Sequence, residues 1–581
     1  MSAVQLLANF DRLAEAPGAV PRLRRFILDL AVRGKLVEQD AGDEPAAELL
    51  KRIQAEKRKG DKRQIVEAKF AATDTQFVVP KNWISVPLIS LGSWAIGAGF
   101  PKNEQGLRDG EYFFLKVSDM NLPGNEKYIT TSQNSIDADA AKRMRANIHP
   151  AGTIIFPKIG GAIATNKRRI LTKGSAIDNN CLGITFSPEI DGDWAYLLLT
   201  FLNFTQYQVG TAVPALQQAI LERIAIGLPP LAEQHRIVAK VDELMTLCDQ
   251  LEAAQQERER CRDRLASASL QRLNQPAAAN PATDQAEAAE AHQQAQREQQ
   301  KDHARFHLQN LNRLTIRPEH IKAMRATIFN LAVRGLLVSQ RAHDESASDL
   351  FTNMLRNKAQ LARLGAIPKE KIVAATAAVT FPLPSLWVVV RLGEICNLVT
   401  SGSRGWAEFY AKSGPKFLRA QNIRFGRLRL DDLACVNPPV KSEGLRTQVR
   451  TGDLLIVITG AGVTNPALLD SDIGEAYVSQ HVALVRPSSP TLSRWLLLCL
   501  MAGPSGRDEL IQRAYGAGKP GLNLDNIRSL NTPLPPLAEQ HRIVAKVDEL
   551  MALCDQLEAQ LTQSQTDSRR LLEAVLEAAI A

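Results

Sequence analysis

The sequence predicts an α+β protein in which two α/β domains are separated by two long antiparallel coiled-coil helices, with an internal pseudo-twofold repeat. Three observations predict this fold. A segment of 26 residues occurs twice with one difference, each copy has the apolar spacing of a long helix, and each copy follows a stretch of short β-rich runs. At 581 residues the chain also exceeds what one hydrophobic core usually supports, so several domains are expected.

The repeat is the most specific feature of the sequence. Leu228–Ala253 reads LPPLAEQHRIVAKVDELMTLCDQLEA, and 534–559 differs from it only where Ala552 replaces Thr246. A shorter segment, FILDLAVRGKLV at 26–37, returns as TIFNLAVRGLLV at 327–338. The long copies lie 306 residues apart, which fits a duplicated unit of helix, globular segment and helix. Two interpretations of the near identity stay open: both copies present the same surface to the same partner, or the copies recombined recently.

Each copy predicts a long helix. Two prolines, Pro229 and Pro230, block helix upstream of the first copy, and apolar residues then alternate in steps of four and three, as in a coiled-coil seam. The expected seam residues are Ile237, Val241, Leu244, Cys248 and Leu251, and then Ile543, Val547, Leu550, Cys554, Leu557, Leu561, Leu571, Val575 and Ala578. Helices over 231–273 and 537–580 would each be roughly 65 Å long. The seam cysteines are expected to be small hydrophobic residues, with reactive thiols as the alternative.

The segments between the helices predict mixed sheets. Short runs such as GTIIF and DLLIVIT are punctuated by Gly and Pro over 77–227 and 381–532. The stretch 275–300 is rich in Ala and Gln without a large apolar residue, which predicts a tether or a solvated helix. The expected order is a helical segment at 1–75, a domain at 76–228, a helix at 229–274, a linker at 275–304, a helical segment at 305–375, a domain at 376–533 and a helix at 534–581.

Basic residues with few acidic neighbours lie at corresponding places in the two globular segments, and aromatic residues are interleaved with them from Trp406 to Phe425. Unpaired cations suit phosphate contacts, and Arg, Asn and Gln suit the reading of base edges. The candidate DNA-binding residues are Lys116, Lys158, Lys167, Arg168, Arg169 and Lys173, and then Arg404, Lys412, Lys416, Arg419, Gln421, Asn422 and Arg424. The alternative for each cluster is an ordinary solvated face, and for Gln421 or Asn422 it is a capped turn.

Composition argues against several classes of protein. The longest apolar stretch, which begins at Trp495, has about half of the roughly 20 residues that a spanning helix needs. Asp11 and Glu15 interrupt what would be the apolar core of an export signal. Seven cysteines without a CxxC pair fit a reducing cytosol and argue against disulfides and a zinc site. A cytoplasmic protein without a membrane partner or a bound metal is expected.

Catalytic motifs are incomplete in this sequence. The run VNPPV at 436–440 has Val440 where an adenine methyltransferase needs an aromatic residue to stack on a flipped base. The run AYGAGKPG lacks the Ser or Thr that follows the lysine of a phosphate-binding loop. His235 and His541, which the repeat pairs, are expected to be surface or docking residues and not catalytic bases. No catalytic residue is predicted, and the chain is expected not to be an enzyme by itself.

The doubled LPPLAEQHRIVAKVDEL, with each copy closing a globular segment, resembles the specificity subunit of type I restriction-modification systems. The resemblance covers nearly the whole chain apart from 275–300. It implies two target recognition domains that each read half of a split site in double-stranded DNA, two methyltransferase subunits docked on the helical regions, and restriction subunits that join them. S-adenosylmethionine, ATP and Mg²⁺ would then be used by the partners, with no cofactor in this chain. The docking residues implied are Glu233, Gln234, His235 and Arg236, and Glu539, Gln540, His541 and Arg542.

Two other interpretations make different predictions. A coiled-coil scaffold with two heads that bind a ligand other than DNA should show no steep salt-dependent affinity for DNA. A methyltransferase that uses the NPPV run should bind S-adenosylmethionine as an isolated chain.

Overall fold

The structure is a computed structural model that describes residues 16–60, 78–210, 212–275, 286–310, 314–315, 317–368, 378–402, 405–438, 446–514 and 521–580. The chain forms two compact units. The first unit comprises 1–257 and 565–581, and the second comprises 258–564. Each unit therefore contains one globular domain together with parts of both long helices, α8 (Leu231–Asn274) and α16 (Leu537–Ile580).

The domain of the first unit is built from three main groups of strands, as well as α5 (Ala138–Met144) and α6 (Gly192–Phe201). The five-stranded sheet has the order β2 (Gly92–Ile96), β9 (Cys181–Phe186), β6 (Ile154–Pro157), β7 (Arg169–Leu171) and β4 (Tyr128–Ile129). The three-stranded sheet has the order β5 (Ser135–Ile136), β3 (Tyr112–Leu115) and β8 (Ser175–Ile177). At the base of the domain, β1 (Ile84–Pro87) pairs antiparallel with β12 (Ala225–Leu228).

The domain of the second unit repeats this arrangement. The four-stranded sheet has the order β14 (Cys396–Ser401), β22 (Val482–Pro487), β19 (Leu454–Val457) and β20 (Pro466–Leu468). The three-stranded sheet has the order β18 (Ala434–Val436), β15 (Tyr410–Leu418) and β21 (Ala476–Val478), and β13 (Val388–Arg391) pairs with β23 (Asn531–Leu534). A hairpin of β16 (Ile423–Arg424) and β17 (Arg427–Leu428) is added, and α13 (Ser493–Met501) corresponds to α6.

The two domains share both connectivity and register type. In each three-stranded sheet, the central strand pairs antiparallel with one neighbour and parallel with the other. The order of β2, β9, β6 and β7 matches that of β14, β22, β19 and β20. The predicted mixed sheets and the internal repeat are therefore confirmed strand by strand, although most of the sequence between the repeated segments differs.

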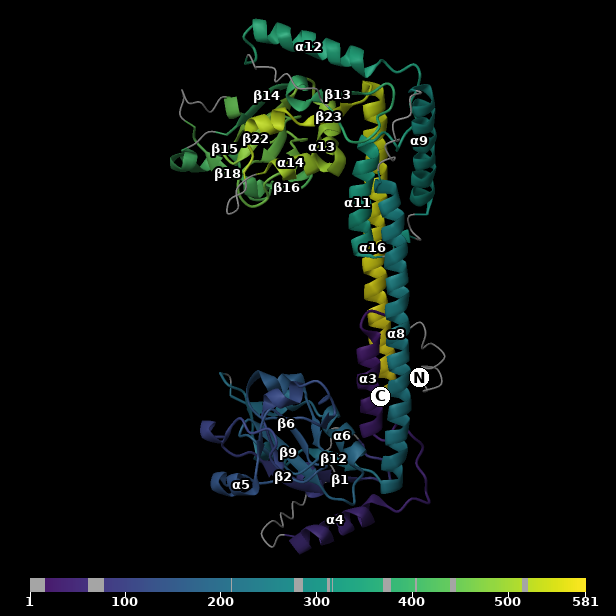
Figure 1. The fold of residues 1–581 in the computed structure, drawn as a ribbon, viewed down its shortest axis with the longest axis vertical. Coiled ribbons are helices and arrows are strands. Elements are labelled where there is room, and N and C mark those ends of the chain that lie inside the picture. Colours follow the sequence, from purple (N-terminus) through teal and green to yellow (C-terminus); the bar gives the residue numbers. More distant parts are fainter. Residues whose placement is uncertain are drawn as a thin grey trace. The chain divides into compact units, whose positions relative to one another are not determined.

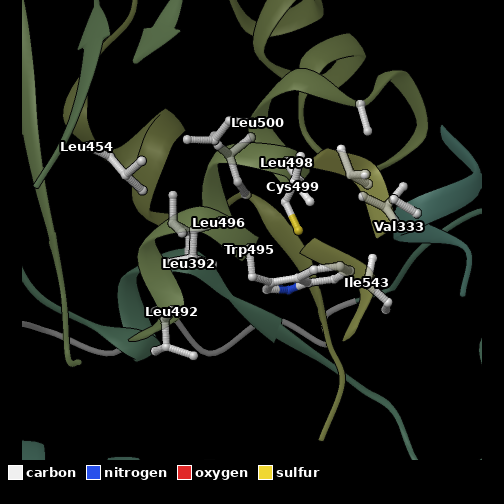
Figure 2. Close-up of a cluster of buried hydrophobic side chains, with 14 of the residues drawn as sticks. Val333, Leu392, Leu454, Leu492, Trp495, Leu496, Leu498, Cys499, Leu500 and Ile543 are labelled. Carbon is white, nitrogen blue, oxygen red and sulfur yellow. The ribbon is translucent and has the colours of Figure 1, made fainter. Parts of the chain in front are cut away.

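Each domain shares its hydrophobic core with its helices. In the second unit, one buried cluster contains Trp495 and Cys499 of α13, Val333 of α11 (Pro318–Val333) and Ile543 of α16. Figure 2 shows Trp495 next to Ile543, with Cys499 above the indole ring. The indole N–H of Trp495 donates to the carbonyl of Pro533 in β23 at 2.9 Å. The first unit has the equivalent cluster around Trp194, α3 (Ala19–Val32) and Ile237.

The long helices are 44 residues each and are confirmed in extent to within a residue of the predicted bounds. Ile237, Val241 and Cys248 of the predicted seam are buried, as are Ile543, Val547, Leu550, Cys554 and Leu557. In the second unit, α8, α11 and α16 lie side by side (Figure 1). The prediction was wrong at Leu571, which is 58% exposed, and at Ala578, which is also exposed; the neighbouring Leu572 faces α3 in place of Leu571.

The stretch between the two repeats also differs from its prediction. Within it the structure describes α9 (Ala286–Gln309), which belongs to the second unit. Ala304 and His307 of α9 are buried, and the His307 ring lies 2.6 Å from the hydroxyl of Ser269 on α8. Within the predicted stretch 275–300, Arg297 donates to the carbonyls of Arg334 and Gly335, both at 3.3 Å, so this part of α9 is also packed on one side and not solvated all round. Within the described residues, no helix has both the length and the hydropathy needed to cross a membrane.

Candidate nucleic-acid interface

A short turn follows the central strand of each three-stranded sheet, and both turns are built in the same way. In the first domain, Asp119 is buried and its carboxylate accepts from the backbone N–H of Lys116 at 2.8 Å. In the second domain, the side-chain oxygen of Asn422 accepts from the N–H of Arg419 at 3.0 Å. The amide of Asn422 also donates to the carbonyls of Arg429 and Asp432, at 3.2 and 2.9 Å.

Asn422 is therefore a turn residue. It is 1% exposed, and the three contacts above occupy its amide group, so it is removed from the candidates for base reading. The residue before it, Gln421, is exposed, and so is the matching Ser118 in the first domain. The same turn thus presents a hydroxyl in one domain and a longer amide in the other.

The cluster around Lys167 divides between structural and exposed residues. Arg168 is 2% exposed, and its guanidinium donates to the carbonyls of Leu199 and Leu202 at the end of α6, at 2.9 and 3.1 Å. It also lies over the ring of Phe204, 4.1 Å from the centroid. Burial lowers the pKa of Arg168 to about 9, so the group stays protonated at neutral pH. Because the carbonyls that end a helix lack intrahelical donors, Arg168 caps α6 and is removed from the DNA-contact set.

The neighbours of Arg168 fasten β7 to the turn after β3. Two nitrogens of Arg169 donate to the carbonyl of Met120, at 3.2 and 2.9 Å, and burial lowers the pKa of this half-buried group. The Lys167 ammonium donates to the side-chain oxygen of Asn121. The structure therefore brings Lys116, Lys167 and Arg169 together around one turn, whereas no contact joins Lys158 or Lys173 to them within the described residues.

The four candidate lysines of the first domain, unlike Lys127, have no acidic partner among the described residues. Lys116 donates to the amide oxygen of Gln105 at 2.8 Å, and the Lys173 ammonium lies 4.1 Å from the centroid of the Phe113 ring. Among the described residues, no carboxylate is within ion-pair distance of Lys116, Lys158, Lys167 or Lys173. Their charge is available to an external anion.

The second domain also presents candidate cations at its surface. Arg404 lies outside the described residues. Lys412 and Arg424 are exposed, and the Lys416 ammonium is 3.7 Å from the sulfur of Cys435. The Arg419 guanidinium is 3.9 Å from the carboxylate of Asp432, a weak pairing. Of the interleaved aromatic residues, Trp406 and Phe417 stack on one another in a buried cluster, so only Tyr410 and Phe425 remain substantially exposed.

The predicted docking motif lies at an internal joint between domain and helix. Glu233 and Gln234 are fully buried, and Glu539 and Gln540 are buried in the same way. Gln234 accepts from the N–H of Asp191 at 3.0 Å, and Gln340 donates to Glu539 at 3.4 Å. These four residues are corrected from docking to structural residues, because burial within their own unit leaves them no free surface.

An ion pair between an arginine and an aspartate completes the joint in each unit. Arg236 donates to both carboxylate oxygens of Asp43, at 3.1 and 2.6 Å, and Arg542 makes the same pair with Asp344, at 3.2 and 2.6 Å. The hydrogen bond from arginine lowers the pKa of each aspartate. Burial raises the pKa of Glu233 and of Glu539. Of the predicted motif, only His235 and His541 remain exposed.

A different part of the repeated segment is open to solvent, a feature that the prediction of docking residues missed. We define the exposed stripe as Ala232, His235, Ala239, Asp242, Glu243, Leu247 and Gln250 on α8, and Ala538, His541, Ala545, Asp548, Glu549, Leu553 and Gln556 on α16. Steps of three and four place these residues on one helix face. Leu247 and Leu553 are 44% and 37% exposed. Identity at positions outside the buried seam was the signal that could have identified this stripe.

The family of type I restriction modification DNA specificity domains matches residues 80–259 and 384–564, which is more than half of the chain. The chain belongs to this family. Each match begins just before the first strand of a domain and continues into a long helix, so the specificity-domain repeat includes both the sheets and the joint described above.

Among curated relatives, this specificity subunit is similar to the EcoAI specificity subunit of Escherichia coli, with 28% identity over 97% of this chain and 94% of the relative. The EcoEI specificity subunit of Escherichia coli is 27% identical over the same shares. Among solved structures, the HsdS subunit from Thermoanaerobacter tengcongensis is 19% identical, with a TM-score of 0.42 over 87% of this chain and 99% of that chain.

Proposed function

We infer that this specificity subunit reads a split site in double-stranded DNA, with one half-site bound by each domain. The observation that carries this inference is that the two domains share one framework but differ in the residues exposed on it. Strand order and turn construction are the same in both domains, whereas the exposed residues at the turn differ, as Ser118 and Gln421 do. Different exposed donors and acceptors on one framework are what two different half-sites require.

The exposed stripes suggest the partners. Two nearly identical surfaces, one on α8 and one on α16, suit two copies of one protein, and we infer that each stripe docks a methyltransferase subunit. Restriction subunits would then join this core. S-adenosylmethionine, ATP and Mg²⁺ would be bound by those partners, and the specificity subunit would supply recognition without catalysis, in the cytoplasm. The single difference in the repeat, Thr246 against Ala552, lies at an exposed position and changes the surface only slightly.

A domain exchange tests the division into half-sites. Residues 381–532 are replaced by the corresponding segment of a relative, and methylated bases are mapped across the genome of the host. One half of the methylated sequence should change while the other half and the spacer stay the same, because base contacts belong to each domain and the joints are retained. The matched control replaces 77–227 and should change only the opposite half. Changes in both halves from a single exchange would contradict modular reading.

A further inference from the structure

The hairpin of β16 and β17 places two arginines directly opposite one another. Arg424 and Arg427 are cross-strand partners in the register of the hairpin, and both are exposed. Directly opposed side chains share a face with Cβ atoms about 5 Å apart, and like charges in that arrangement destabilise a hairpin. Between them, Phe425 is 42% exposed, and Gly426 turns the chain with φ 77°.

The turn of the hairpin, Phe425 and Gly426, is fixed by contacts with the rest of the domain in spite of this repulsion. The N–H of Gly426 donates to the carbonyl of Pro466 in β20 at 2.9 Å, and Ile423 is buried in the domain core. Arg507 of α14 (Arg507–Arg513) lies 5.0 Å from the centroid of the Phe425 ring and donates to the carbonyl of Thr464. The positive φ of Gly426 favours glycine there, and a Cβ would also require the terminal methyl of Met501, 2.7 Å away, to shift.

The nearby carboxylates that the structure describes are paired with other arginines. The two nearest aspartates in sequence, Asp431 and Asp432, lie beside Arg429 and Arg419, at 2.9 and 3.9 Å. Within the described part of the second domain, no carboxylate lies within ion-pair distance of Arg424 or Arg427. In the first domain, by contrast, Lys127 beside β4 is paired with Asp193 at 2.8 Å.

We propose that the β16–β17 hairpin is a phosphate clamp, in which Arg424 and Arg427 bind neighbouring phosphates of the DNA backbone beside the second half-site and Phe425 packs on the sugar between them. The proposal rests on the proposed function. A base edge offers neutral acceptors that would leave the repulsion between two guanidinium groups in place, whereas phosphates neutralise both. The clamp therefore adds affinity and fixes the register of the domain on the duplex without reading sequence.

The test compares the full-length chain with the double variant Arg424→Ala/Arg427→Ala. The probes are a duplex that carries the methylated site mapped in the host and a scrambled duplex of equal length. Loss of two phosphate contacts should reduce the slope of log affinity against log salt by about 1.8, equally for both duplexes. The sequence methylated in a host that carries the variant should be unchanged. A slope equal to that of the parent chain, or altered bases in the second half-site, would overturn the clamp.

A matched control removes two charges elsewhere in the same unit. Arg356 and Arg363 are exposed on α12 (Ala347–Arg363), which Figure 1 shows on the opposite side of the second domain's sheets from β16. Arg356→Ala/Arg363→Ala should keep the parental slope, and an equal reduction would assign the effect to net charge and overturn the clamp. If the alanine variant unfolds, Arg424→Gln/Arg427→Gln is measured instead. A parent chain that binds neither duplex would refute the proposed function itself, which is a separate outcome.

Discussion

At the scale of single residues, burial decides which cations serve recognition. Arg168 belongs to a run of three basic residues in the sequence, and its neighbours on either side are partly exposed. The open end of α6 holds this one side chain inward, where its donors meet helix carbonyls. A triple substitution of Lys167, Arg168 and Arg169 would therefore mix a folding defect with a binding defect.

We predict that Arg168→Ala lowers the unfolding free energy of the first unit by roughly 2–4 kcal/mol, because it leaves helix-end carbonyls unpaired under Phe204. Denaturant titration followed by circular dichroism measures the loss. Arg168→Lys keeps the charge without the fork of donors and should recover only part of the stability. Lys167→Ala is the control, with stability unchanged and a shallower salt dependence of DNA binding. A stable Arg168→Ala protein with weakened DNA binding would contradict the capping role.

Two residues of the joint, Asp344 and Glu539, should change the stability of the second unit with pH in opposite directions. Arg542 lowers the pKa of Asp344 from its ordinary 3.8, so this carboxylate contributes stability above that pH and loses it as pH falls through the lowered value. Burial raises the pKa of Glu539 from its ordinary 4.5, so ionising this group costs stability as pH rises through the raised value.

We therefore predict opposite signs for two isosteric substitutions. Asp344→Asn should lose about 1–3 kcal/mol of unfolding free energy at pH 7, and the loss should begin to shrink as pH falls below 3.8 towards the lowered pKa of Asp344. Glu539→Gln should be at least as stable as the parent at pH 7 and equal to it below pH 4.5. Denaturant titrations between pH 3 and 7 measure both, and Asp43→Asn and Glu233→Gln should repeat the two signs in the first unit. The same sign for both substitutions would refute this account of the joint.

At the scale of elements, the repeated helix combines two functions on different faces. The buried face, with Ile237 and Gln234, packs against the domain, and the exposed stripe is open to solvent. We predict that Leu247→Arg removes one methyltransferase subunit from the complex, that Leu553→Arg removes one, and that the double variant removes both, because a buried arginine without a partner disrupts an apolar contact. Native mass spectrometry of the co-expressed complex measures the subunit count. Leu364→Arg, on a 72% exposed leucine outside the long helices, is the control and should leave both partners bound.

The sequence predicted elements better than it predicted residue roles. Periodicity gave the long helices to within a residue, because a seam that repeats over many turns is a redundant signal. The roles of Asn422, Arg168 and Glu233 could not be obtained this way, since each depends on a contact with a segment distant in sequence or on a turn closed by its own side chain. The packing of α9 within 275–300 was likewise unexpected, because its contacts there are polar ones, such as those of Arg297, which carry no apolar periodicity.

At the scale of the whole molecule, α8 and α16 each pass from one compact unit into the other. We predict that four extra residues after Glu257, matched by four after Ser564, lengthen both helices by about 6 Å and keep their seams nearly in phase. Leu251 is a poorer site for insertion because it packs against the core of the first unit. The spacer between the methylated half-sites should then grow by about one or two base pairs, while both half-sites stay the same.

Genome-wide mapping of methylated bases measures this change of spacing. The control is a four-residue Gly-Ser insertion after Gln275, where α8 has ended, and it should leave the spacer at its parental length. A variable spacer in the helix-insertion variant, or altered half-sites, would show that the helices do not set the distance.

The core that each domain shares with its helices also governs how the protein unfolds. Trp495 belongs to a cluster that includes the sheet residue Leu454, Val333 of α11 and Ile543 of α16. Exposing the sheet therefore strips the helices of their buried face, and fraying the helices opens the sheet. The sheets also have a second buried cluster of their own, around Leu455, Val457 and Leu484. We therefore expect each domain to unfold cooperatively with the helices that share its core. Heat or a destabilising substitution in one domain should first loosen the helix surface against which that domain packs.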